Sequence, residues 1–261
     1  RQLLDAGCRS FAILFDDILG EMGQADSVAF GSLAKAQCEM ANAIYSELLA
    51  KPGGRLIFCP TPYCQRMADN QHGGANYLNE VGRYLDSDID LFWTGPEIIS
   101  REISIESVSE LRETIQRKPV IWDNLHANDY DLTRFFLGPY AGRPLKLREE
   151  VSGFMINPNC EYEANFVALK TLAGYLRASG SWNSRSAYKE SLEAWLPRFA
   201  TVGEGGVTLD DLTLLGAAYY LPPETGELAE QLSEDVRVLV ARPVDAWGGS
   251  ECLPRQGVCT A

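Results

Sequence analysis

Long apolar runs and basic clusters are both missing from this 261-residue sequence. No apolar stretch approaches the roughly 18 residues that a membrane-spanning helix needs, so we expect no membrane partner. The sequence holds 23 Lys and Arg against 36 Asp and Glu, a formal net charge of −13, and no basic cluster is interleaved with aromatic residues. Because such a surface repels nucleic acid at long range, we expect no nucleic-acid partner either.

Metal-binding and cofactor-binding patterns are also scarce. The only histidines are His72 and His126. Two are too few for a histidine-rich metal site, and we expect each to be a structural hydrogen-bonding group. The acidic run 86–90 follows a calcium-loop spacing, but Leu91 replaces the turn glycine that such a loop needs. With no glycine-rich phosphate loop in the sequence, we predict no metal and no cofactor.

The cysteine pattern does not indicate a disulfide framework. The seven cysteines form no CxxC pair, their number is odd, and several lie in apolar segments. We therefore expect reduced thiols and a cytoplasmic and nuclear location.

Five short apolar runs alternate with helical patterns. Each run ends in polar, Gly or Pro residues, as is typical of buried strands, and the runs are 11–15, 55–59, 89–93, 119–122 and 151–156. Apolar residues at helical spacing lie between them at 32–50, 74–85 and 104–117, the last with Ser107 as a candidate cap. This alternation predicts parallel βα units, in which chemistry gathers where the strands end.

Each of these strand ends carries a polar or aromatic side chain that can contact a small ligand. The residues are Asp16, Asp17, Tyr63, Thr94, Asp123, Asn124 and Asn157. Five such coincidences favour a binding site at one edge of the sheet.

The sequence becomes predominantly helical after Glu161. We expect helices at 163–178, 185–199, 208–221 and 226–241, with a glycine-rich joint at 203–206, a Pro-Pro turn at 222–223 and an irregular tail at 242–261. We place a domain boundary near residue 180, so that 1–180 is an α/β domain and 181–261 a helical region.

Five strands do not close an eight-stranded barrel. A partial barrel exposes two unpaired strand edges, which soluble proteins avoid. Since the sequence also begins with Arg1 rather than Met, we expect three further strands upstream of it.

The run FAILFDD at 11–17 ends in two adjacent carboxylates, Asp16 and Asp17. Neighbouring side chains on a strand point to opposite sides, so the two acids can occupy different environments where the chain turns into a loop. Such a division is what paired acid chemistry requires. Taken alone, however, the pair more often marks a solvated loop start or a helix N-cap.

Six motifs, in order, resemble the family 84 glycoside hydrolases. They are GCRSFAILFDD at 7–17, FCPTPYC at 58–64, WTGP at 93–96, VIWDNLHANDYD at 120–131, FLGPY at 136–140 and NPNCE at 157–161. The resemblance covers roughly residues 5–180, and the part near 209–226 is similar to the helical stalk domain of animal members. It implies a (β/α)8 TIM-type barrel, of which this sequence holds strands four to eight only, followed by an α-helical stalk-like region.

The resemblance also implies a function. Members of this family are retaining exo-β-N-acetylglucosaminidases that remove O-linked N-acetylglucosamine (O-GlcNAc) from Ser and Thr of proteins. Asp16 would orient and polarise the 2-acetamido group of the sugar, whose own oxygen attacks and forms an oxazoline. Asp17 would be the general acid and then the general base. This substrate-assisted route is a recognised exception to the two-carboxylate scheme.

Four polar residues are assigned to the sugar by the same resemblance. Tyr63 and Asn124 would surround the acetamido group and the reacting centre, and Asp129 and Asn157 would bind sugar hydroxyls. Judged from the residues alone, the last three are as readily explained by helix capping or loop stabilisation, and Tyr63 beside Pro62 by a turn.

Two further residues, Trp122 and Cys59, would line the pocket beneath the N-acetyl methyl group. An aromatic wall with a few polar anchors suits a sugar. Without the resemblance, ordinary strand-core positions are the better explanation for both.

Two rival functions stay open. The family's sugar-binding glycine and lysine have no counterpart here, so the first rival is a catalytically inactive glycan-binding or protein-binding remnant of the fold. The second is an aspartate-dependent phosphoesterase that uses Mg²⁺. In the leading hypothesis the partners are O-GlcNAc-modified proteins and a second copy of the chain, bound through the helical region, with Trp195, Leu196 and Phe199 as contact or supporting core.

Overall fold

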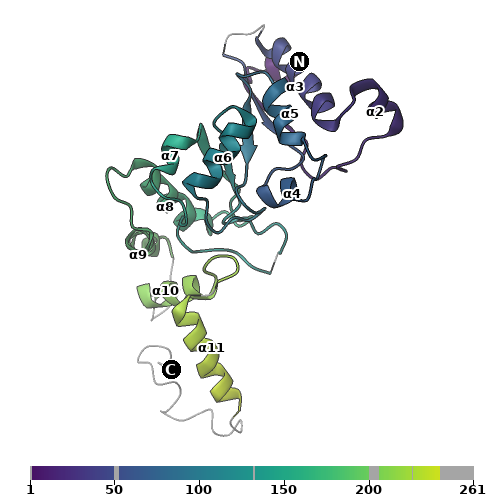
Figure 1. The fold of residues 1–261 in the computed structure, drawn as a ribbon. Helices are drawn as coiled ribbons and strands as arrows, with labels where there is room; N and C mark the ends of the chain where they lie inside the picture. Colours follow the sequence, from purple (N-terminus) through teal and green to yellow (C-terminus); the bar gives the residue numbers. More distant parts are fainter. Residues whose placement is uncertain (1, 50–52, 132, 200–205, 225, 242–261) are drawn as a thin grey trace.

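The fold is a parallel five-stranded half-barrel followed by helices (Figure 1). The structure, a computed structural model, describes residues 2–49, 53–131, 133–199, 206–224 and 226–241. Its strands are β1 (Ser10–Leu14), β2 (Arg55–Cys59), β3 (Asp90–Trp93), β4 (Val120–Asp123) and β5 (Gly153–Ile156). They pair in sequence order and all in parallel, which confirms the predicted partial (β/α) barrel.

Helices connect the strands. They are α1 (Gln2–Asp5), α2 (Gln24–Phe30), α3 (Leu33–Leu49), α4 (Gln65–Asp69), α5 (Tyr77–Tyr84), α6 (Ile105–Ile115), α7 (Leu147–Glu150) and α8 (Asn165–Arg177). The long helices α3, α5, α6 and α8 agree with the apolar spacing of the sequence. The four short ones were not predicted, because four to seven residues are too few to show a helical period.

The cap of α6 differs from the predicted one. Ser104, not Ser107, is the N-cap residue, and its side chain accepts a hydrogen bond from the backbone N–H of Ser107 at 3.1 Å. The prediction was three residues late because the helix begins with Ile105, before the apolar stripe becomes regular.

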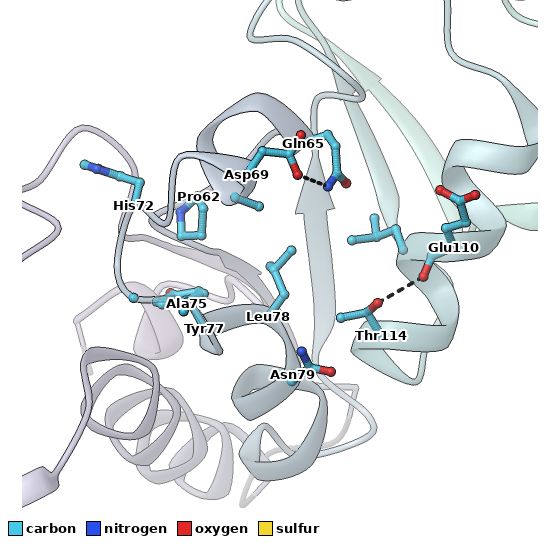
Figure 2. Close-up of a pocket in the computed structure, with 13 residues that line it drawn as sticks. Pro62, Gln65, Asp69, His72, Ala75, Tyr77, Leu78, Asn79, Glu110 and Thr114 are labelled. Carbon is cyan, nitrogen blue, oxygen red and sulfur yellow. Dashed lines mark hydrogen bonds between the residues drawn. The ribbon is translucent and has the colours of Figure 1, made fainter.

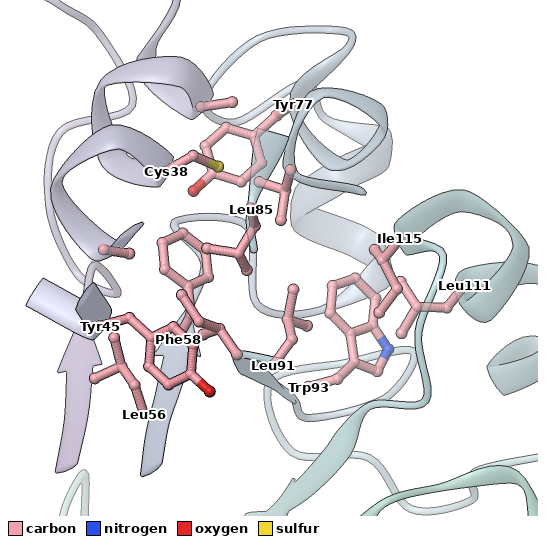
Figure 3. Packing of buried hydrophobic residues seen from close by; sticks show 14 of the residues in the cluster. Cys38, Tyr45, Leu56, Phe58, Tyr77, Leu85, Leu91, Trp93, Leu111 and Ile115 are labelled. Carbon is pink, nitrogen blue, oxygen red and sulfur yellow. The ribbon is translucent and has the colours of Figure 1, made fainter. Parts of the chain in front are cut away.

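The main core lies between the sheet and the helices α3, α5 and α6 (Figure 3). Alternate strand residues point into it: Leu56 and Phe58 from β2, and Leu91 and Trp93 from β3. The residues between them face the other side, because side chains alternate along a strand.

A smaller cluster on that second side of the sheet comprises Cys59, Phe92, Val120, Ile57, Tyr63 and Trp122. The strand period therefore carries Cys59 and Trp122 to the inner side of the half-barrel.

The two edges of the described sheet are β1 and β5. Leu14 on β1 and Met155 on β5 are both exposed, although each is a strand residue of apolar character. The expectation of three further strands stays a prediction.

The helical region packs against the half-barrel. It comprises α9 (Ser184–Trp195), the 3₁₀ helix η1 (Leu196–Arg198), α10 (Leu209–Ala218) and α11 (Glu227–Val240). Trp195 is buried in a cluster with Val167 of α8, Leu192 and Leu212, so it belongs to the supporting core of this region. Among the described helices, none is long and apolar enough to cross a membrane.

The domain boundary near residue 180 stays a prediction. The expected tail at 242–261 and most of the joint at 203–206 lie outside the described residues.

A fully buried ion pair holds the end of β4. The guanidinium of Arg143 donates to both carboxylate oxygens of Asp123, each at 2.7 Å, and the two side chains are 0% and 1% exposed. Tyr140 donates to the same carboxylate at 2.8 Å. The remaining guanidinium N–H groups donate to the carbonyls of Ser100, at 2.7 Å, Arg101, at 2.6 Å, and Ala141, at 2.8 Å. The pair thereby joins three segments of chain.

We expect Arg143→Met to lower the free energy of unfolding by about 3–5 kcal/mol, because it leaves the carboxylate of Asp123 buried without its counter-charge. Urea unfolding at neutral pH measures the change. The matched control is Arg112→Met, which breaks the partly exposed pair with Glu150 and should cost less than about 1 kcal/mol. Equal losses in the two variants would contradict the prediction.

Candidate active site

A cavity of about 330 Å³ lies where the strands end, and all eight predicted site residues line it. They are Asp16, Asp17, Cys59, Tyr63, Trp122, Asn124, Asp129 and Asn157. The structure therefore brings together residues that are far apart in the sequence, the farthest being Asp16 and Asn157 at a separation of 141 positions. Their individual roles stay predictions.

The paired acids lie in a turn rather than on a strand. Strand β1 ends at Leu14, and the backbone N–H of Phe15 donates to the carbonyl of Cys59 at 3.0 Å. The chain then turns, with Asp17 at φ +50°, a left-handed conformation that Asp tolerates better than most residues. The turn gives Asp16 a half-buried position and Asp17 an exposed one, so the two acids do occupy different environments.

Tyr63 joins the second strand end to Asp17. Its hydroxyl donates to Asp17 Oδ1 at 3.3 Å, across the gap between β1 and the segment after β2. Burial and the neighbouring charge of Asp17 raise the pKa of the Tyr63 phenol well above its usual value. Tyr63 is thus a neutral hydrogen-bond donor throughout the physiological pH range.

Cys59 forms part of the inner wall. Its side chain is buried, and burial together with the charges of Asp16 and Asp17 raises the pKa of the thiol well above its usual value. A thiol that stays protonated is a poor nucleophile. Cys59 therefore contributes an apolar surface to the cavity, beside Trp122, whose ring packs against Phe92 with centroids 4.8 Å apart.

Asn124 presents an unpaired acceptor. Its amide nitrogen donates to the carbonyl of Ile98 at 2.8 Å, which fixes the side chain. Its Oδ1 is buried and has no hydrogen-bond partner among the described groups. Because buried polar atoms are nearly always paired, this unpaired oxygen of a cavity-lining residue is a candidate acceptor for a ligand N–H or O–H group.

Asp129 and Asn157 complete the polar lining. Asn157 is held through its backbone N–H, which donates to the carbonyl of Asp123 at 2.9 Å. Asp129 is exposed at the rim beside Tyr130, which is 56% exposed.

One predicted ligand contact is wrong. Asp123 was expected to be able to contact a ligand because it ends β4. Its carboxylate instead accepts hydrogen bonds from Arg143 and Tyr140, and Asp123 does not line the cavity. Thr94 does line it, although its hydroxyl donates to the carbonyl of Glu97 at 2.8 Å.

The sequence analysis missed Ile98, Ile99, Ala127 and Tyr130 among the lining residues. No periodic signal marks these loop positions. Ala127 and Tyr130 lie within the family-like motif at 120–131, whereas the only sequence signal for Ile98 and Ile99 is their position in the loop after the predicted strand at 89–93.

A second cavity, of about 320 Å³, lies among α4, α5 and α6 (Figure 2). Its polar side chains include Gln65, Asp69 and Glu110, all exposed, and the Gln65 amide donates to the Asp69 carboxylate at 2.8 Å. No paired strand-end acids line it, so the first cavity is the better candidate for an active site.

Behind the first cavity lies a buried histidine. The His126 ring is 1% exposed and donates from Nε2 to the carbonyl of Gly138 at 2.9 Å. Burial lowers the pKa of His126 from 6.5 to about 4, although the hydrogen bond to Gly138 opposes the shift. The expected structural role of this histidine therefore fits its contacts.

Comparisons with known proteins agree on one family. A family model described as β-N-acetylglucosaminidase matches residues 1–202. The chain is 47% identical over 178 residues to the protein O-GlcNAcase of Rattus norvegicus and equally to that of Mus musculus. These alignments cover 68% of this chain and 19% of each relative, so the chain spans about a fifth of their length.

A solved structure is also similar. An O-GlcNAc hydrolase mutant of Thermobaculum terrenum superimposes with a TM-score of 0.74 at 27% sequence identity. The match covers 92% of this chain and 50% of that chain.

The buried histidine predicts a loss of stability on acidification. Below pH 6.5 the unfolded chain binds a proton at His126, whereas the folded chain binds this proton only near pH 4. The free energy of unfolding therefore falls as the pH falls from 6.5 to about 4. Between pH 7 and 5.5 we expect a loss of about 1 kcal/mol from this group. In His126→Gln, which keeps a donor for the Gly138 carbonyl, urea unfolding should show that much less acid sensitivity. An unchanged pH dependence would contradict this.

Proposed function

Because the chain belongs to the β-N-acetylglucosaminidases of glycoside hydrolase family 84, we propose that its cavity removes β-linked N-acetylglucosamine from Ser and Thr of modified proteins. The family predicted from the sequence motifs is thereby confirmed. Substrate class and activity are proposals for this chain, supported by relatives named protein O-GlcNAcase, of which it spans about a fifth.

One observation carries the proposal. Two adjacent carboxylates, Asp16 and Asp17, lie at one cavity in unequal environments, beside a neutral phenol and an unpaired amide oxygen. A hydrolase that splits its chemistry between two acids needs them close to one sugar and differently exposed.

In the first step the substrate attacks itself. The Asp16 carboxylate accepts a hydrogen bond from the acetamido N–H, which makes the acetamido oxygen more nucleophilic. That oxygen forms a bond to the anomeric carbon while the bond to the Ser or Thr oxygen breaks, and Asp17 gives its proton to the departing oxygen. The product is an oxazoline that keeps its proton on nitrogen, where it stays hydrogen-bonded to the Asp16 carboxylate, so no carboxylate of the protein becomes attached to the sugar.

In the second step Asp17, now a carboxylate, removes a proton from water. The water oxygen attacks the anomeric carbon, the oxazoline opens, and two inversions give net retention. Tyr63 donates to Asp17 and stabilises its charged form between the two steps.

The remaining residues hold the sugar. The Asn124 Oδ1 accepts from a group at the reacting centre, and Asp129 and Asn157 bind sugar hydroxyls at the rim. Trp122 and Cys59 give the N-acetyl methyl group an apolar surface, since the thiol is uncharged. The chemistry uses no cofactor, because the nucleophile belongs to the substrate.

The two acids should differ in their dependence on the leaving group. Asp17→Asn removes the proton donor, so we expect turnover of an O-GlcNAc peptide to fall by about 10²–10⁴-fold, and turnover of an aryl glycoside with an acidic phenol to fall far less. Asp16→Asn should slow both substrates to a similar extent, because it acts on the attacking amide. Steady-state kinetics of both substrates measures the contrast.

Asp88→Asn is the matched control, because Asp88 is exposed just before β3, at the opposite end of the sheet, and this variant should keep full activity. An Asp17→Asn protein with unreduced activity on the glycopeptide contradicts the assignment. If the unmodified chain turns over neither substrate and calorimetric titration shows no tight binding of an oxazoline-mimicking inhibitor, the inactive-remnant alternative is favoured, since tight binding requires a transition-state-like pocket.

A further inference from the structure

We propose that the turn at 219–224, in the helical region, is a positioning element for the candidate active site. It acts through a strip of chain at 134–138 that lies between this turn and the cavity wall. The inference rests on the proposed function for its catalytic consequence, and its structural part can be tested without activity.

One edge of the strip bonds to the loops behind the cavity. The Asn128 amide donates to the carbonyl of Arg134 at 2.7 Å. The Asn159 side chain accepts from the backbone N–H of Phe136 at 2.6 Å and donates to its carbonyl at 3.0 Å. The two asparagine side chains thus replace a neighbouring strand for this part of the backbone.

The same asparagines do not line the cavity themselves, but they lie in the two segments that supply its wall. Asn128 lies within 124–130, the segment that carries Asn124 and Asp129, and Asn159 lies two residues after Asn157. The Asn128 Oδ1 also accepts from the backbone N–H of Cys160 at 2.7 Å, which ties the segment after β4 to the segment after β5.

His126 is the third residue of these loops that bonds to the strip. Its ring donates to the carbonyl of Gly138 at 2.9 Å and is buried, two residues from Asn124. A displacement of the strip at Gly138 therefore acts directly on the segment that places Asn124.

The other edge of the strip bonds to the helical region. The backbone N–H groups of Leu137 and Gly138 donate to the carbonyls of Tyr219 and Tyr220, both at 2.7 Å. The rings of Phe135 and Tyr219 stack with centroids 4.3 Å apart.

Leu221 extends this contact into the half-barrel. It is buried in a cluster with Leu125, Tyr140 and Tyr175. Arg101, whose carbonyl accepts from Arg143, also forms an ion pair with Glu224 of the same turn.

Gly138 shows how close the two backbones are. A Cβ at this position would lie 2.5 Å from the Leu221 side chain and 2.6 Å from the Tyr220 carbonyl oxygen. Only glycine lets the turn bond to the strip while the strip's own carbonyl bonds to His126. Because both edges of the strip are engaged, the position of the turn determines the position of the wall.

The test compares Leu221→Ala with Leu48→Ala, which makes the same substitution at a buried leucine of the main core, in α3. We expect Leu221→Ala to speed amide hydrogen exchange in 124–130 by about tenfold or more, whereas Leu48→Ala leaves exchange there unchanged. The His126 ring N–H signal should shift in Leu221→Ala only; His72→Gln assigns it, since the chain has two histidines. Leu221→Met should restore both readouts.

In kinetics with an aryl N-acetyl-β-glucosaminide, we expect Leu221→Ala to raise KM several-fold and lower kcat, and Leu48→Ala to change neither. Identical exchange in the two alanine variants overturns the inference, and so does faster exchange with unaltered kinetics. If the unmodified chain has no turnover, the proposed function fails and the exchange comparison alone decides the positioning role. Should Leu221→Ala not fold, Tyr219→Leu, which removes the stacking on Phe135 from a half-buried site, takes its place.

Discussion

The geometry of the candidate site depends on the buried ion pair between Asp123 and Arg143. Asp123 is the last residue of β4, and its neighbour Asn124 is the first cavity-lining residue of the loop that follows this strand. The guanidinium of Arg143 fixes the end of this strand and also donates hydrogen bonds to the carbonyls of Ser100 and Arg101. These two residues directly follow Ile98 and Ile99, which line the cavity. A fully buried charge pair tolerates little movement, because each broken hydrogen bond leaves a buried polar atom that water cannot reach to replace the lost partner.

The site is therefore built from strand ends but held by buried polar contacts. Strand pairing brings Asp16 and Cys59 to the same edge of the sheet, and the loops that follow carry the hydrogen-bonding groups. Asparagines 124, 128 and 159 each bond to backbone in a neighbouring segment. Because amides both donate and accept, they can join irregular segments that cannot form a sheet ladder. The helical region adds to this network through backbone bonds at Tyr219 and Tyr220.

Much of this arrangement could be predicted from the sequence. Apolar runs with punctuated ends located all five strands to within two residues, and the parallel order then predicted Asp16, Asp17, Tyr63, Asn124 and Asn157 at one edge of the sheet. Cys59, Trp122 and Asp129 were expected at the cavity only from the family resemblance, and they line it too. Short helices such as α4 were not predicted, because they are too short to show a full hydrophobic period. Asp123 was misjudged because its partner, Arg143, is 20 positions away in a loop, and local sequence does not show which of two adjacent polar residues turns inward. A loop at the paired acids was expected, but the left-handed conformation of Asp17 was not, because such a conformation of Asp has no signal in a single sequence.

The protonation of Cys59 and Tyr63 has a consequence for ligand choice. With thiol and phenol both neutral, aspartates 16, 17 and 129 are the only described cavity-lining residues with acidic carboxyl groups, and no described lining residue is a lysine or arginine. The electrostatic potential inside the cavity is then negative wherever these carboxyl groups are ionised, and its magnitude grows as water leaves. A sugar ring that acquires positive charge at its anomeric carbon is stabilised by this potential, and iminosugars whose ring nitrogen is protonated should be held more tightly than neutral rings of the same shape.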